Sequence, residues 1–333
     1  AAWRETRARW SELFVTAHER AQRGQLPWVA HLKGRTKAWA FERGFVGHLA
    51  LFSKRFVAEG GTYFERAPVT SVKFVQLTSR VGTVTPAALF ACPHLARIAK
   101  LDLDGSSLGA REAQQLADSP HIQSLRALGL GGHNLIPERS VPALLAAAPD
   151  LTELSFARNV WLKTDHALAL AGCPAFAAVA SLDLTSCMVI AEGVRALVAG
   201  PHARGALQVL RLAAEEGFES ERGVPFRARA DGVQVCEVVA DSKALGSLRV
   251  LNLNFRNIGP GGLEVLAGGA KSLPALRELH LEACGLSITA VKVLARSALG
   301  PQLLYLNLRD NPALRRYANQ LAGLFPAAQI EEP

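Results

Sequence analysis

One short motif in the chain has the residue types and spacing of a hydrolase nucleophile. Gly105, Ser107 and Gly109 form the pattern G-x-S-x-G, in which a serine on a tight strand-to-helix turn presents its hydroxyl to a carbonyl. Such a serine needs an oxyanion-binding segment, of the His-Gly-Gly-Gly type, and none accompanies it. The motif also coincides with a small-residue turn that recurs along the chain, so we predict that Ser107 is not a nucleophile.

Other residues that could carry chemistry give equally weak patterns. Cys284 with His280 would supply a thiol and a base, but Cys284 occupies the recurring turn position and should face inward. The nine histidines show no H-x-x-x-H or H-E-x-x-H spacing for a metal, and the glycine-rich stretch 129–134 lacks the lysine of a phosphate loop. We therefore predict no catalytic residue, no metal site and no cofactor, and a protein that is not an enzyme.

The dominant pattern is a repeat of L-x-x-L-x-L. Its clearest copies end at Leu253, Leu281 and Leu308, and the first leucines of successive L-x-L pairs lie mostly 26 to 29 residues apart. Alternation at period two marks a short strand whose leucines point inward. Because each strand is followed by a connection long enough to cross back, we expect the strands to stack in parallel.

A turn, a helix and a stop signal complete each unit. Three residues after the second leucine come Ser106, His133, Asn159, Cys187, Cys284 and Asn311, whose side chains suit hydrogen bonds to a turn, and an apolar residue follows at Leu108, Leu135, Trp161, Val189, Ile258, Leu286 and Leu314. We expect these apolar residues to close the core beneath the turn. Helical stretches such as 261–270 and 289–297 follow. A proline, as at Pro93, Pro174 and Pro274, then ends the unit.

Composition agrees with a large folded protein. The chain has 333 residues, 49% of them hydrophobic, which is enough for a sizeable core. The five cysteines are odd in number and far apart, so we expect reduced, buried thiols and a cytoplasmic location. No apolar stretch is long enough for a membrane span. The sequence begins at Ala1 without a methionine, which suggests that an N-terminal piece precedes it.

The first 67 residues form a separate compositional unit. They carry twelve Lys and Arg against six Glu, a net charge of +6 out of +8, and four of the five tryptophans. Residues 2–22 show the spacing of an amphipathic helix with Trp3, Trp10 and Phe14 on one face. This segment is interpreted as a cap over the end of the core. The alternative is a basic surface for nucleic acid or an anionic membrane.

The repeat resembles a known family pattern. A period of 27 to 28 with a full helix per unit resembles the ribonuclease-inhibitor type of leucine-rich repeat, over roughly residues 68–326. The resemblance implies an α/β solenoid or horseshoe with a parallel concave sheet and convex helices. Arg43-Gly44-Phe45 and Ala67-Pro68-Val69 are similar to the junction in a bacterial family of leucine-rich-repeat proteins with a short N-terminal companion domain, whose acidic helix this sequence lacks. We predict two domains, a capping segment at 1–67 and the repeat domain at 68–333.

The concave sheet is the surface that such an architecture leaves for binding. Residues between and beside the inward leucines are small in the middle units and become polar, charged and aromatic towards the C-terminus, a composition typical of recognition surfaces. The predicted partner-binding residues on this wall are Arg211, Asn252, Asn254, Glu278, His280, Glu282, Tyr305, Asn307 and Arg309.

One unit is longer than its neighbours. The spacing of 41 residues between Leu210 and Leu251 includes an inserted loop near 213–229, and long insertions in solenoids tend to lie at binding edges. The loop residues predicted to bind a partner are Phe218, Arg222, Phe226, Arg227 and Arg229. The alternative interpretation is a tolerated surface loop without a binding role.

Three functional hypotheses follow from these patterns. The first is a non-enzymatic scaffold that binds a protein partner on the concave face. The second is a basic N-terminal binder of nucleic acid or anionic membrane, which the spread of both charge signs over the whole chain disfavours. The third is a sensor subunit of a larger signalling or defence system.

Overall fold

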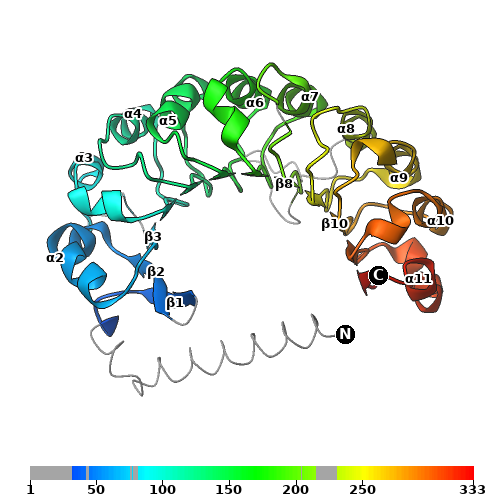
Figure 1. Ribbon diagram of the computed structural model, residues 1–333, viewed down its shortest axis with the longest axis horizontal. Helices are drawn as coiled ribbons and strands as arrows, with labels where there is room; N and C mark the ends of the chain where they lie inside the picture. Colours follow the sequence, from blue (N-terminus) through cyan, green and yellow to red (C-terminus); the bar gives the residue numbers. More distant parts are fainter. Residues whose placement is uncertain (1–31, 43–44, 76, 78–81, 204, 215–230) are drawn as a thin grey trace.

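The protein is an arch built from repeated strand-turn-helix units. In the computed structural model the strands line the inner face and the helices cover the outer face (Figure 1). The structure describes residues 32–333, apart from 43–44, 76, 78–81, 204 and 215–230. None of the helices in these ranges is long and apolar enough to cross a membrane.

The inner layer is one continuous sheet whose strands follow each other in chain order. Its strands are β1 (Ala38–Glu42), β2 (Phe45–Leu51), β3 (Ser71–Phe74), β4 (Lys100–Asp102), β5 (Ala127–Gly129), β6 (Glu153–Ser155), β7 (Ser181–Asp183), β8 (Val209–Arg211), β9 (Val250–Asn252), β10 (Glu278–His280), β11 (Tyr305–Asn307) and β12 (Gln329–Glu331). The first pair is antiparallel, and every later pair is parallel, as the repeat predicted. Each repeat therefore adds one strand beside the last, and the solenoid grows along its axis.

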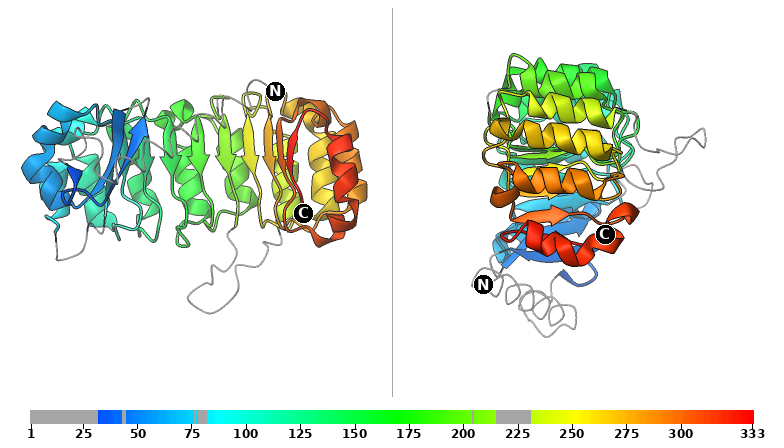
Figure 2. Two further views of the ribbon diagram at one scale, coloured as in Figure 1. Left: turned by 90° about the horizontal axis from the view of Figure 1, so that it is seen from below. Right: turned by 90° about the vertical axis from the view of Figure 1, so that its right-hand side faces the viewer.

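The outer layer consists of helices (Figure 2), several of which are flanked by a 3-10 turn. The helices are α2 (Ser53–Arg66), α3 (Pro86–Phe90), α4 (Ala110–Ala117), α5 (Val141–Ala147), α6 (Thr164–Ala171), α7 (Ala191–Ala199), α8 (Gly232–Ala240), α9 (Gly259–Gly268), α10 (Ile288–Arg296) and α11 (Ala318–Leu324). The 3-10 turns are η2 (Pro93–Arg97), η3 (Glu138–Ser140), η4 (Pro174–Ala178), η5 (Ala270–Ser272), η6 (Gly300–Gln302) and η7 (Pro312–Tyr317). The prolines at the start of η2 and η4 confirm the predicted stop between a helix and the next strand.

The core is a stack of equivalent leucines. Leu251 lies opposite Leu279, which lies opposite Leu306, and all three are fully buried. The same position continues back to Val72 and Leu49 in β3 and β2. Each buried aliphatic side chain contributes roughly 1.5–3 kcal/mol relative to the exposed state, so the repeat supplies its stability in nearly equal steps.

A second buried row, which we call the turn row, joins successive repeats through polar side chains. Its members are Ser106, Asn134, Asn159, Cys187, Arg256, Cys284 and Asn311. Asn159 Nδ2 donates to the Leu130 carbonyl of the preceding repeat at 2.9 Å, and Cys284 Sγ donates to that of Leu253 at 3.2 Å. The Ser106 side chain is too short to make the equivalent hydrogen bond, and its buried Oγ has no partner. The row satisfies carbonyls that the strands leave unpaired.

Two repeats depart from the predicted register. His133 was expected in the turn row, but the residue there is Asn134, which donates to the carbonyls of Leu103 and Gly131. Leu135 and Trp161 were expected to close the core and are 55% and 44% exposed. The positions are filled by Ile136 and Leu162. Each of these two turns holds one residue more than the turns after β4 and β7. The apolar residue expected from the pattern is therefore exposed, and the apolar residue after it is buried.

Arg256 is the largest fully buried side chain in the described part of the protein. Its Nε donates to the Leu212 carbonyl at 2.8 Å, and its second terminal nitrogen donates to the Val189 carbonyl at 2.9 Å. The other terminal nitrogen lies 3.5 Å from Asp231 Oδ1. Because Leu212 and Asp231 lie before and after the inserted segment 215–230, Arg256 joins the two ends of the long repeat.

The sheet passes without a break from the first 67 residues into the repeats. β2 pairs in parallel with β3, and α2 packs beside η2 of the next unit, where Phe56 and His94 meet edge to face. The domain boundary at residue 67 therefore remains a prediction. The expected amphipathic helix at 2–22 lies outside the described residues.

Candidate functional site

Neighbouring strands place the predicted concave residues side by side. Arg211 lies opposite Asn252, Asn252 lies opposite His280, and His280 lies opposite Asn307. The row ends at Glu331 in β12, a residue that the sequence analysis missed. Together with Asn254, Glu278, Glu282, Tyr305 and Arg309, these residues form what we call the C-terminal concave surface.

An imidazole and a phenol meet in the middle of this surface. The rings of His280 and Tyr305 have centroids 4.9 Å apart, and His280 Nε2 lies 4.0 Å from Glu278 Oε2. Burial lowers the pKa of His280 below its usual value, despite the opposing field of the Glu278 carboxylate. Burial and a hydrogen bond with Glu331 raise the pKa of Tyr305. Both side chains are therefore neutral at neutral pH, and the ring pair is suited to contact a partner without a charge of its own.

A carboxylate held by two amides lies beside the ring pair. Glu282 Oε2 accepts from Asn254 Nδ2 at 3.3 Å and from Asn307 Nδ2 at 3.0 Å, and the Asn254 oxygen accepts from the Glu282 amide at 2.9 Å. Because side chains from the units on both sides hold it, the Glu282 carboxylate is preorganised.

Asn307 is the exception among the predicted contact residues. It was expected to face solvent and is only 4% exposed. Its amide nitrogen binds Glu282, and its oxygen accepts from the Arg309 amide at 3.0 Å. Asn307 therefore holds other members of the surface in place.

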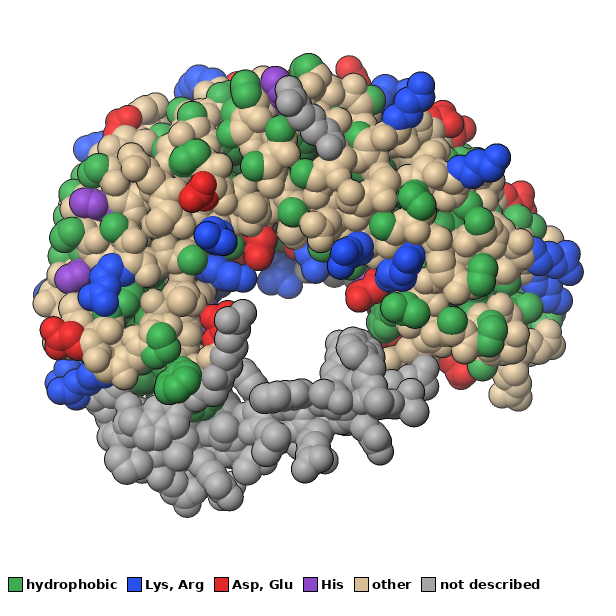
Figure 3. Space-filling view, viewed as in Figure 1, with side chains coloured by type: hydrophobic (Ala, Val, Ile, Leu, Met, Phe, Trp, Pro, Cys, Tyr) green, Lys and Arg blue, Asp and Glu red, His purple; other side chains and the backbone are tan. Residues whose placement is uncertain are grey.

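Charged side chains also line the N-terminal part of the concave wall, ahead of the small residues expected in its middle units. Lys73 and Asp102 on β3 and β4 form an ion pair at 2.8 Å. Asp104 Oδ1 accepts from the Gly131 amide at 2.7 Å, and burial together with the nearby Asp102 raises the pKa of Asp104. Basic and acidic side chains follow the inner edge of the arch in the space-filling view (Figure 3). The inner wall is thus charged at several places, including the part where small residues leave it hollow.

The inserted loop cannot be placed on the site. Phe218, Arg222, Phe226, Arg227 and Arg229 lie outside the described residues. The chain before the insertion adjoins the C-terminal concave surface, because the Ala214 amide donates to the Asn254 carbonyl at 2.9 Å. The loop residues therefore remain predictions.

Comparison with known proteins supports the fold. The crystal structure of the leucine-rich-repeat-containing protein LegL7 from Legionella pneumophila is similar, with a TM-score of 0.51, 17% sequence identity, and coverage of 85% of this chain and 89% of that one. The chain has the leucine-rich-repeat fold. A second similar structure, from the complex of Rad7 and Elc1 in yeast, has a TM-score of 0.42, 17% identity, and coverage of 79% of this chain and 75% of that one. No family model and no curated protein matches the sequence.

The residues that resembled catalytic groups are explained by the leucine-rich-repeat turn. Ser107 has a positive φ of 51°, as a nucleophile turn would, but Asn257 and Gly285 have the same left-handed backbone one residue after their own turn-row residues. Cys284 faces inward as predicted, and burial raises the pKa of its thiol to about 12. Both geometries belong to the repeat. Within the described residues, no group of three or more His, Cys, Asp or Glu could hold a metal ion.

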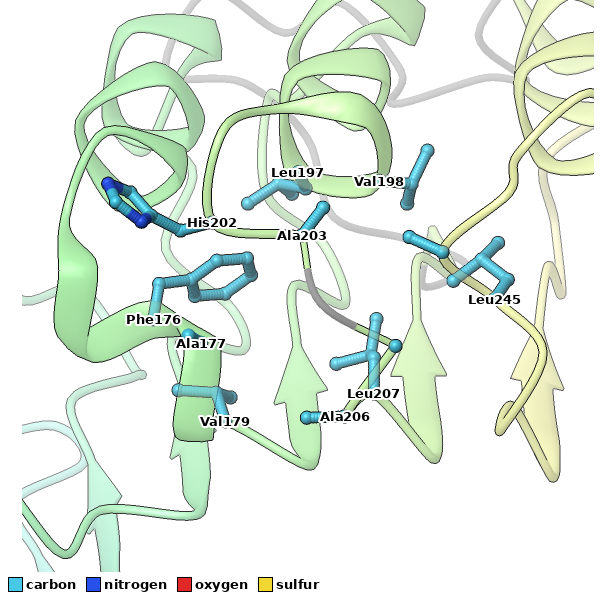
Figure 4. Close-up of a pocket in the computed structure, with 12 residues that line it drawn as sticks. Phe176, Ala177, Val179, Leu197, Val198, His202, Ala203, Ala206, Leu207 and Leu245 are labelled. Carbon is cyan, nitrogen blue, oxygen red and sulfur yellow. The ribbon is translucent and has the colours of Figure 1, made fainter.

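A small, mostly apolar pocket lies between η4, α7 and the segment that leads into β8 (Figure 4). Phe176, Leu197, Leu207 and Leu245 surround a cavity of about 20 Å³. A volume of this size holds at most one water molecule. His202 is the only titratable group among the described residues that line it, so the pocket is a packing gap.

Proposed function

We propose that the protein is a non-enzymatic scaffold that binds a protein partner on its C-terminal concave surface. The observation that carries this proposal is the row of Arg211, Asn252, His280, Asn307 and Glu331 across consecutive parallel strands, all of which except Asn307 reach solvent. Polar, charged and aromatic groups on a rigid concave wall are the composition found at protein interfaces.

Several groups on this surface keep bonding capacity for a partner. Arg211 has no ion pair with any described residue, and the Arg309 side chain is 60% exposed with its nearest carboxylate, Glu331, at 3.7 Å. Tyr305 and Arg309 belong to the residue types that most often dominate binding energy at interfaces. The fixed carboxylate of Glu282 would then select a partner that offers a donor opposite it.

The test is a comparison of captured proteins between two matched variants. The site variant carries Arg211→Ala, His280→Ala, Tyr305→Ala and Arg309→Ala. The control variant carries Glu264→Ala, Lys292→Ala, Val293→Ala and Arg296→Ala on the outer helices α9 and α10. Each purified protein is coupled to resin, exposed to extract of its native cell, and the bound proteins are quantified by mass spectrometry.

We expect at least one protein to be enriched about tenfold or more on wild type and control relative to the site variant, since several interface contacts are removed. Urea unfolding of both variants checks that the fold is retained. If every protein captured by wild type is captured equally by a folded site variant, the concave surface is not the binding surface.

A further inference from the structure

The N-terminal end of the arch holds a cavity that the concave surface does not include. It has a volume of about 600 Å³ and is lined by the turn at 34–37, the first turn of α2, and Gly82. This volume is in the range of sites for small ligands. From its charges we propose that this cavity is a binding site for a phosphate monoester.

The lining carries a strong surplus of positive charge. Arg35, Lys37, Lys54 and Arg55 line the cavity with a single carboxylate, Glu59. Arg35 and Arg55 share that carboxylate at 3.6 and 3.3 Å. Neither lysine has an ion pair with a described residue, so the cavity has a net charge of +3. A phosphate monoester, with up to two negative charges and three acceptor oxygens, complements such a set of donors.

Two further features of the lining favour an anion in the cavity. Helix α2 has no acidic residue in its first turn and no side-chain cap, so the positive end of its dipole is not neutralised. Lys37 Nζ lies 4.8 Å from the centre of the Phe52 ring, which holds the ammonium group at the wall. Phe52 also lines the cavity and offers an apolar face to the organic part of the ligand.

Backbone hydrogen bonds fix the walls relative to one another. The Lys37 amide donates to the Ala50 carbonyl at 2.7 Å, and the Lys54 amide donates to that of Gly82 at 3.3 Å. The Val84 amide donates to Ser53 Oγ at 3.0 Å. At Gly82, φ is +75° and an added Cβ would lie 3.0 Å from the Phe52 ring, so a larger residue would strain this wall. A preformed cavity loses little entropy when it binds a ligand.

The experiment measures phosphate binding by the full chain at constant ionic strength. Inorganic phosphate is titrated calorimetrically into wild type, into Lys37→Gln/Lys54→Gln, and into the control Lys243→Gln/Lys271→Gln, which removes two exposed lysines in later repeats. We expect the dissociation constant to rise at least about tenfold in the cavity variant, because two charge-assisted contacts are lost. The control should stay within about twofold of wild type.

A variant expected to tighten phosphate binding separates loss of the site from loss of the fold. Glu59→Gln removes the carboxylate that competes for Arg35 and Arg55 and should tighten phosphate binding about threefold or more. The proposal is overturned if wild type shows no saturable phosphate binding, if both lysine variants weaken binding equally, or if Glu59→Gln weakens it in a protein with an unchanged unfolding midpoint.

A vesicle-binding experiment distinguishes a lipid headgroup from a soluble phosphate monoester as the ligand. Phosphatidylcholine vesicles with and without phosphatidylinositol 4-phosphate are sedimented with each protein. Binding that requires the phosphorylated lipid, is lost in the cavity variant and is displaced by inorganic phosphate identifies a lipid headgroup. Saturable phosphate binding without vesicle binding identifies a soluble phosphate monoester. Vesicle binding that persists in the cavity variant contradicts the site.

Discussion

Two rows of polar side chains cross the repeats of the arch. One is the turn row, and the other, which we call the concave row, is formed by Arg211, Asn252, His280 and Glu331 on the C-terminal concave surface. The two rows differ in burial and bonding. In the turn row, Asn311 bonds the carbonyls of Leu281 and Leu308 and the Leu286 amide, so it has no exposed group left. In the concave row, Arg211 and Asn252 are half-buried and reach solvent. Residues only four positions apart, such as Asn252 and Arg256, thus differ in burial and bonding, depending on which side of the sheet they lie.

A polar side chain that is buried and fully hydrogen-bonded contributes to the stability of the fold. A buried donor or acceptor that loses its partner costs about 1–3 kcal/mol, whereas an exposed one is rescued by water. Substitutions in the turn row should therefore lower stability, and substitutions in the concave row should lower binding.

Arg256→Met should be the most destabilising change. It removes the hydrogen bonds to the carbonyls of Leu212 and Val189 and leaves Asp231 without its cation. Loss of one partner from a buried charged network costs about 3–5 kcal/mol. Urea unfolding measures the free energy.

Lys243→Met is the matched control for this change, because it replaces an exposed cation by the same residue. We expect it to change the free energy of unfolding by less than about 0.5 kcal/mol. Equal effects of the two substitutions would show that Arg256 does not join the ends of the long repeat.

Asn311→Ala should lower the free energy of unfolding by about 2–3 kcal/mol, because buried backbone groups in two adjacent turns lose their partner. Asn252→Ala removes the same amide from the concave row and should cost less than about 1 kcal/mol. The pair is compared by urea unfolding. If Asn252→Ala proved as costly as Asn311→Ala, the two rows would not differ in their roles.

Most of the fold could be predicted from the sequence because its repeat is local. The L-x-L pairs gave the positions of strands such as β9, β10 and β11, and the leucines of these pairs are buried as expected. β12 was missed because Ile330 stands there without the second leucine of a pair. Its alternation with Gln329 and Glu331 was the only signal, and it is too short to distinguish from chance.

The side-chain partners could not be predicted to the same extent. Arg256 stands where the pattern has Asn or Cys, and nothing in its sequence shows that it bonds Val189, 67 positions away. In the long repeat, the side chain in the turn row must reach the distant Val189 carbonyl, and an arginine side chain is long enough to do so whereas an asparagine is not. The burial of Asn307 is equally hidden in the sequence, because its partner is the carboxylate of Glu282 in the preceding unit.

His280 is intermediate in burial between the turn row and the more exposed members of the concave row, and the pH dependence of stability tests how strongly its burial matters. Its side chain is 22% exposed, and burial lowers its pKa. The unfolded chain, where the imidazole has its ordinary pKa near 6.5, then binds the proton more readily than the folded one. Stability is therefore complete above pH 6.5 and is lost as the pH falls towards the folded-state pKa.

His280→Gln should reduce this loss, because glutamine does not titrate. Urea unfolding at pH 7.5 and pH 5.5 measures the difference for wild type and variant. His48, whose pKa burial also lowers, stays in both proteins and contributes equally, so only the His280 share changes. A variant with the same pH dependence as wild type would mean that this imidazole is solvated like an exposed residue. His280 would then resemble the solvent-accessible members of the concave row and would contribute nothing to the pH dependence of stability.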